Sequence, residues 1–179
     1  MSVEKKFNKI SHRINTIKDM VKDKNVDSIV DYEVDTDIEV DENLTSDDIR
    51  HLLPKKYLDF NKTIKELGGK LLYIKSGSTG HTFKGVHPEG SSNYSYAVKI
   101  VAYPKKENYG DLFNAKRPEN AEILMIKILS YFVRNNQSPH IILPITTFNT
   151  SIKPFLNLPK NNIVNNKRFD LFVKRYKKG

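Results

Sequence analysis

The middle of the chain alternates short apolar runs with turn residues, a pattern that predicts β-strands. Three runs rich in β-branched and aromatic residues follow one another: KLLYIKSG from position 70, HTFKGVH from 81 and YSYAVKIVAY from 94. Two later runs have the same character, HIILPITTF at 140–148 and RFDLFVKRY at 168–176. We therefore expect a five-stranded antiparallel sheet.

Apolar residues at helical spacing predict one long helix between the third and fourth strands. It begins near Pro118, a residue type favoured in the first turn, and continues to Val133. Before the sheet, shorter helices are predicted at 45–53 and at 57–67, and the second of these ends against a pair of glycines. The order βββ, α, ββ corresponds to the α+β fold class.

The N-terminal quarter of the chain differs in composition from the remainder. Apolar residues recur every three or four positions between Phe7 and Val21, which predicts a short amphipathic helix. The stretch 25–49 holds ten acidic residues and neither Lys nor Arg, whereas 50–179 holds 23 basic and 8 acidic residues. Within the acidic stretch, the alternation in DYEVDTDIEVDE fits either a disordered linker or a strand. We expect an N-terminal extension at 1–49 and one domain at 50–179.

Composition excludes several kinds of site. Cysteine is absent and the five histidines never stand at metal-ligand spacing, so no metal site is predicted. No apolar stretch approaches the roughly 18 residues of a membrane span, and the N-terminus has no signal-peptide pattern. We therefore expect a soluble intracellular protein without a membrane partner.

The formal net charge is +9, but Lys and Asn supply 41 residues, a bias typical of AT-rich codon usage. Because that bias explains the basic surplus as readily as nucleic-acid affinity does, no nucleic-acid partner is expected.

Glycines and small polar residues lie between the first two strands, in KSGSTGHTFKG at 75–85, and a lysine follows in YAVKI at 96–100. A P-loop requires GxxxxGK[ST] between a strand and a helix, and a KH domain places its GxxG loop between two helices. Neither context is present, because this loop joins two strands. An ordinary surface turn fits the sequence. So does a hairpin whose backbone N–H groups face phosphates, since glycines without a Cβ atom allow close approach.

The lysine of YAVKI stands out from the other lysines because of its neighbours. Strand alternation places Lys99 on the same face as Ala97 and Val101. A lysine between apolar residues is expected to be partly covered, and a covered ammonium group needs an anionic partner.

The segment 70–178 resembles the N-terminal lobe of protein kinases. IKSGSTGHTFKG is similar to the kinase glycine-rich loop, and YAVK is similar to the VAIK strand. The resemblance implies that Ala97 contacts adenine and that Lys99 holds the α- and β-phosphates. It also implies that the loop contacts ATP through Gly77, Ser78, Thr79 and Gly80, with Gly77 and Gly80 at the second and third glycine positions.

In such kinases the lysine pairs with a glutamate on the long helix. Glu122 takes this role by resemblance, because apolar residues follow it on the same helix face, and Glu119 is the alternative one turn earlier. Two positions depart from the kinase pattern. Lys75 stands where the first glycine is usual, and Thr82, the remaining residue expected at the ATP site, replaces the valine that covers adenine.

The 179 residues contain no HRD and no DFG motif. The resemblance therefore implies an ATP-binding lobe truncated before the catalytic loop, with the catalytic base and the Mg²⁺ ligands on a C-terminal kinase lobe. ATP is the expected ligand, and Mg²⁺ is expected only together with that lobe. The phrase SPHIILPI is similar to serine/threonine kinases of large nucleocytoplasmic DNA viruses, which implies a location in the host cytoplasm or the virion. The alternative function is a kinase-like interaction module without phosphotransfer activity.

Overall fold

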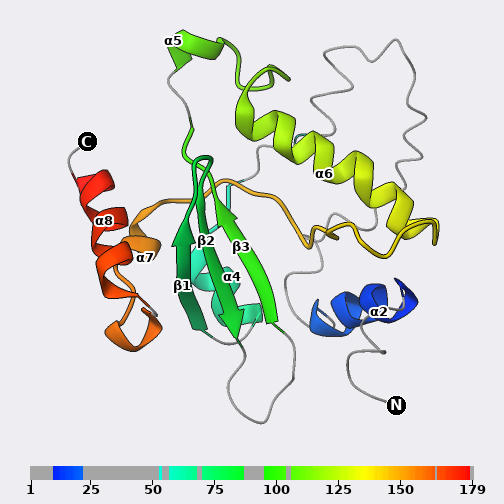
Figure 1. Ribbon diagram of the computed structural model, residues 1–179, viewed down its shortest axis with the longest axis horizontal. Coiled ribbons are helices and arrows are strands. Elements are labelled where there is room, and N and C mark those ends of the chain that lie inside the picture. The colour runs from blue at the N-terminus through cyan, green and yellow to red at the C-terminus, as the bar shows by residue number, and fades with distance from the viewer. Residues whose placement is uncertain are drawn as a thin grey trace. The chain divides into compact units, whose positions relative to one another are not determined.

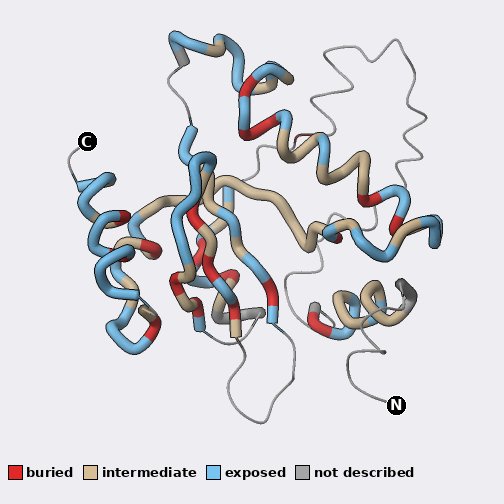
Figure 2. Tube along the Cα trace, in the orientation of Figure 1, coloured by how far each residue is buried: buried red, intermediate tan, exposed pale blue. Residues whose placement is uncertain are grey.

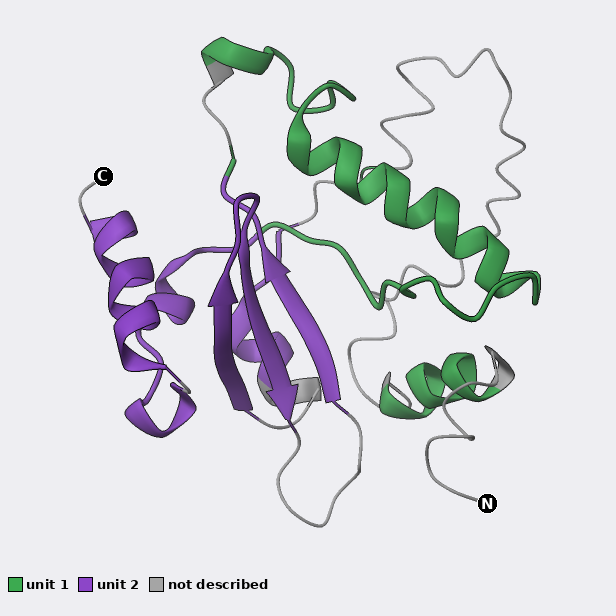
Figure 3. Cartoon of the chain, viewed as in Figure 1, with its two compact units in different colours: residues 1–56, 103–149 green, residues 57–102, 150–179 purple. Residues whose placement is uncertain are grey.

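The computed structural model describes residues 10–21, 53, 57–67, 70–86, 95–103, 106–163 and 165–177. The chain forms two compact units (Figure 3). One contains residues 1–56 and 103–149, and the other contains residues 57–102 and 150–179. The predicted boundary between positions 49 and 50, the acidic stretch and most of the helix predicted at 45–53 lie outside the described residues. Those expectations remain predictions.

The unit formed by 57–102 and 150–179 contains a three-stranded antiparallel sheet (Figure 1). Its strands are β1 (Lys70–Ser76), β2 (His81–Val86) and β3 (Ser95–Ile100), in the order β1-β2-β3. All three coincide with the first three predicted strands, which confirms the meander. Side chains alternate between a buried face and an outward face, as in β2, where every second residue is buried.

A bulge in β1 decides which residues of that strand share a face. Tyr73 pairs with Phe83 and Lys75 pairs with Thr82, so β1 accommodates one extra residue between these two pairs. Tyr73 and Ser76 therefore lie on the same side of the sheet, where their hydroxyl groups are 2.8 Å apart. Strict alternation would have placed residues three positions apart on opposite sides.

Aromatic rings fill the core beneath the buried face. Tyr73 and Phe83 are fully buried, and their ring centroids lie 5.5 Å apart in an edge-to-face arrangement. Rings from two helices pack directly on them, and a ring from a third helix packs on one of those rings. All three helices contain buried segments (Figure 2). The helices are α4 (Phe60–Leu67), α7 (Lys153–Leu156) and α8 (Asn166–Lys177), and α8 lies beside β1. The rings in direct contact are those of Phe155, Phe169 and Phe172, and Phe60 packs on Phe155.

The fifth predicted strand is wrong, because residues 166–177 form helix α8. Its phenylalanines at positions 169 and 172 are buried at helical spacing, whereas Leu171, which a strand would have placed on the same face as Phe169, is 62% exposed. The fourth predicted strand, at 140–148, is an extended segment that pairs with no strand in the described part of the chain. Pro144 supplies no N–H group for a ladder there. The described sheet thus has three strands rather than five.

The other unit is built on α6 (Pro118–Arg134), with α2 (Ile10–Val21) and the short α5 (Lys106–Tyr109). The long helix and the N-terminal amphipathic helix confirm two predictions from the sequence. Arg13 of α2 donates hydrogen bonds from its guanidinium group to the backbone oxygens of Pro139 and Ile141. These bonds attach α2 to the segment that follows α6. Within the described ranges, no helix combines the length and the apolar character needed to cross a membrane.

Candidate functional site

The glycine-rich segment forms the tip of the β1–β2 hairpin. Ser76 and His81 are the last paired residues, and between them the N–H of Gly77 donates a 2.7 Å hydrogen bond to the oxygen of Gly80. The residues between Ser76 and Gly80 are exposed. The structure therefore places the predicted loop residues together on an accessible turn between two strands.

The two glycines of this loop have different surroundings. A Cβ atom added to Gly80 would lie 2.4 Å from the backbone oxygen of Ile100, so the tip passes too close to the end of β3 for any side chain. A Cβ atom added to Gly77 would meet its nearest neighbour, the oxygen of Gly80, at an ordinary 3.7 Å. Of these two loop glycines, Gly80 is therefore the one that packing requires.

Lys99 lies on the outward face of β3, beside the hairpin tip. Its Nζ donates a 3.1 Å hydrogen bond to Oγ1 of Thr79, so the side chain extends toward the loop. Thr82 is directly opposite Lys99 in the sheet, and Ala97 is two positions away on the same face. Lys99 and Ala97 are both exposed, so the expectation that the lysine is partly covered is wrong. The sheet places all of these predicted ligand-binding residues on one accessible surface.

A partly buried hydrogen-bond network lies on the opposite face, at the base of the loop. His81 is 2% exposed, and its Nδ1 lies 2.6 Å from Oγ of Ser76. Its Nε2 lies 2.9 Å from the hydroxyl of Tyr176 on α8. The same serine contacts the hydroxyl of Tyr73, which also donates to the backbone oxygen of Arg168 at 3.3 Å. Both ends of the hairpin tip are thereby attached to α8.

His81 was not among the residues selected from the sequence. Burial lowers the pKa of its imidazole, and the positive charge of Arg175 lowers it further. The ring also packs against Phe172, with 4.4 Å between the centroids. A sequence signal did exist, because His81 is two positions before Phe83 and therefore on its buried face.

The predicted glutamate partner belongs to the other unit. Glu122 lies on α6 and is half-buried. Because each unit is described by itself, the pairing of Glu122 with Lys99 stays a prediction. Glu119, the alternative partner, is buried and accepts a 2.7 Å hydrogen bond from Nε of Arg117. One of its carboxylate oxygens is therefore already paired with a cation.

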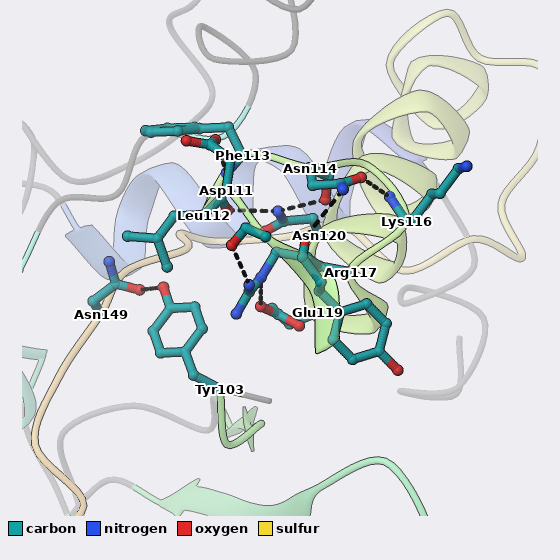
Figure 4. Close-up of polar contacts among 12 residues, drawn as sticks. Tyr103, Asp111, Leu112, Phe113, Asn114, Lys116, Arg117, Glu119, Asn120 and Asn149 are labelled. Carbon is teal, nitrogen blue, oxygen red and sulfur yellow. Dashed lines mark hydrogen bonds and ion pairs between the residues drawn. The ribbon is translucent and has the colours of Figure 1, made fainter. Parts of the chain in front are cut away.

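Figure 4 shows that this charge pair belongs to a polar cluster at the start of α6. Arg117 is 1% exposed and also donates to the oxygen of Gly110 at 3.3 Å. The amide of Asn120, fully buried, donates to the backbone oxygens of Leu112 and Asn114 at 2.7 and 3.0 Å. The cluster satisfies carbonyl groups of the loop before α6 and so fixes how this helix begins.

Tyr103 lies at the edge of this cluster, and burial together with the nearby charges shifts the pKa of its hydroxyl. Its ring lies under the guanidinium of Arg117, 5.8 Å from centroid to carbon, and its hydroxyl donates to Asn149. Burial raises the pKa of Tyr103, and the negative charge of Glu119 raises it further. None of these buried polar roles could be recognised from the sequence, which identified only the helix start at Pro118.

The described residues contain no group of three His, Asp or Glu side chains placed to hold a metal ion. The chemistry available on the outward face is that of a cation and hydrogen-bond donors. An ammonium group, hydroxyl groups and loop N–H groups can bind an oxyanion, and an exposed alanine beside them leaves room for a flat apolar group.

Comparison with curated proteins finds a relative in Acanthamoeba polyphaga mimivirus, named "Putative serine/threonine-protein kinase R400". The two sequences are 43% identical over 143 residues. The chain is thus similar to a viral kinase. The match covers 78% of this chain and 30% of that protein, so the kinase-like chain spans less than a third of its relative's length. No protein-family model and no solved structure matches the chain.

Proposed function

We propose that this chain provides the ATP-binding lobe of a serine/threonine protein kinase, with the hairpin tip and Lys99 as its phosphate site. The observation that carries the proposal is the 3.1 Å hydrogen bond from Lys99 Nζ to Thr79 Oγ1. The ammonium group is directed toward the glycine-containing loop, where it can contact the same oxyanion as the loop N–H groups. The similarity to the mimivirus protein supports the kinase assignment.

The surroundings of Lys99 fit a nucleotide. Ala97 is small and exposed, so it leaves room for an adenine ring, and Thr82 lies opposite Lys99 in β2. None of the three strands contains Asp or Glu, so no carboxylate from the sheet competes for the lysine. The predicted partner Glu122 would orient the lysine from α6.

The chain alone is expected to bind ATP weakly and to transfer no phosphate. One exposed contact of this kind is worth about 1 kcal/mol, whereas micromolar affinity requires about 8 kcal/mol. The 179 residues contain no HRD or DFG motif, so the base and the Mg²⁺ ligands would come from a C-terminal lobe. The lack of these motifs in the 179 residues is equally compatible with a second candidate function, a kinase-like interaction module without phosphotransfer activity.

The test is a titration of the ¹⁵N-labelled chain with ATP, followed by backbone amide shifts. We expect changes at residues 77–82 and at 97–99, and a saturation that Lys99→Met weakens severalfold. A parallel radiolabel assay should detect no transfer to a generic protein substrate. Shifts scattered away from this face, or an unchanged affinity in Lys99→Met, would refute the phosphate site. Turnover by the chain alone would refute the division of the active site between two lobes.

A further inference from the structure

Lys75 lies in the same row of the sheet as Lys99. The bulge in β1 pairs Lys75 with Thr82, and Thr82 pairs on its other side with Lys99. Residues paired across neighbouring strands share a face, so both lysines flank Thr82 on the outward side. Neighbouring strands lie about 4.8 Å apart, which separates the two backbone positions by about 10 Å.

This row is next to the hairpin tip. Lys75 is exposed and precedes the loop by two residues, and Lys99 already reaches Thr79 within the loop. The outward face carries two further lysines, Lys70 and Lys84, but the sheet register places them farther along the strands. All four charges lie on strands that have no carboxylate. No carboxylate within the three strands offsets these charges, and two of them flank the loop.

We propose that Lys75 is a second phosphate-binding cation, which together with Lys99 selects ligands with an extended polyphosphate. This inference rests on the proposed function. Two cations on either side of the loop can contact separate phosphate groups of a nucleoside triphosphate, whereas a monophosphate can engage only one of them. Lys75 thus contributes to the number of phosphates that the site recognises, and Lys99 contributes to binding of all phosphorylated ligands.

The bulge is what makes this role possible. In an unbroken strand, Lys75 would share its face with the buried Tyr73, two positions earlier. With the extra residue accommodated, Lys75 points outward and Ser76 takes the inward position beside His81. The bulge thus supplies both the outward lysine and the inward hydrogen bond that attaches the hairpin to α8.

The experiment compares Lys75→Met with the wild-type chain in the same amide-shift titration, using ATP and AMP as separate ligands. We expect the dissociation constant for ATP to rise about fivefold, the effect of losing one exposed ionic contact. The dissociation constant for AMP should change by less than twofold. Lys75→Arg keeps the charge and should retain most of the ATP affinity.

Lys84→Met is the matched control, because it removes one lysine from the same face at the position opposite Ala97. It should change ATP binding by less than twofold. An equal loss in Lys84→Met and Lys75→Met would assign the effect to general charge, and an equal loss for ATP and AMP would remove the selectivity. Either outcome overturns the proposal. If Lys99→Met weakens ATP binding and Lys75→Met does not, the inference fails while the proposed function stands. If neither has an effect, both fail.

Discussion

Replacing Gly80 by alanine tests how closely the hairpin tip must approach β3. The added Cβ atom would lie 2.4 Å from the backbone oxygen of Ile100 and 3.2 Å from a methyl carbon of Val101. Relief of the closer contact requires a backbone shift of about 1 Å, and overpacking of this kind costs about 1–3 kcal/mol. In a chain of this length, each kcal/mol lowers the melting temperature by about 2–4 °C. We expect Gly80→Ala to melt about 2–12 °C below the wild type.

Gly77→Ala provides the comparison within the same loop, since its added Cβ atom would meet nothing closer than 3.7 Å. Thermal unfolding followed by circular dichroism should show a melting temperature near that of the wild type for this variant. Amide shifts would then show whether Gly80→Ala moves the end of β3 while Gly77→Ala leaves it in place. Equal melting temperatures for the two variants, with β3 unshifted in both, would refute the assignment of a close contact to Gly80.

Three further predictions concern the buried side chains. Because the pKa of His81 is lowered in the folded state, the unfolded chain binds more protons below about pH 6.5, and stability should fall as the pH drops below that value. In thermal melts, His81→Gln should reduce this pH dependence of stability. His140→Gln, at an exposed histidine, should leave it unchanged. Arg117→Met leaves the buried Glu119 carboxylate without its ionic partner and should lower the free energy of unfolding by about 3–5 kcal/mol in urea titrations. A loss below about 1 kcal/mol would contradict the buried pair. Phe172→Ala removes a ring that is 1% exposed and should cost about 3–5 kcal/mol by the same measurement, whereas truncating an exposed side chain should cost little.

The sheet and its outward face could be predicted because period-two alternation and turn residues point to the same assignment there. Lys99 and Ala97 share a face by simple alternation, and the loop between β1 and β2 is short. The bulge near Tyr73 could not be predicted, since it depends on how β1 fits its partner strand and the helix beneath it. The outward position of Lys75 became apparent only from the register.

The segment of α8 was assigned wrongly because its sequence fits two periods. Phe169, Leu171 and Val173 alternate as in a strand, while Phe169, Phe172 and Tyr176 recur as in a helix. Contacts with the sheet select the second pattern, because Phe169 and Phe172 both pack on the ring of Tyr73. Short apolar runs rich in aromatic residues leave this ambiguity to tertiary packing.

The aromatic core is assembled from segments far apart in the chain, and this has a consequence during synthesis. A ribosome that adds about 5–20 residues per second needs several seconds to proceed from Ile100, at the end of β3, to Asn166, at the start of α8. During that interval the rings of Tyr73 and Phe83 lack the covering phenylalanines of α8. The nascent hairpin therefore presents an apolar surface on which molecular chaperones can act before α8 leaves the exit tunnel.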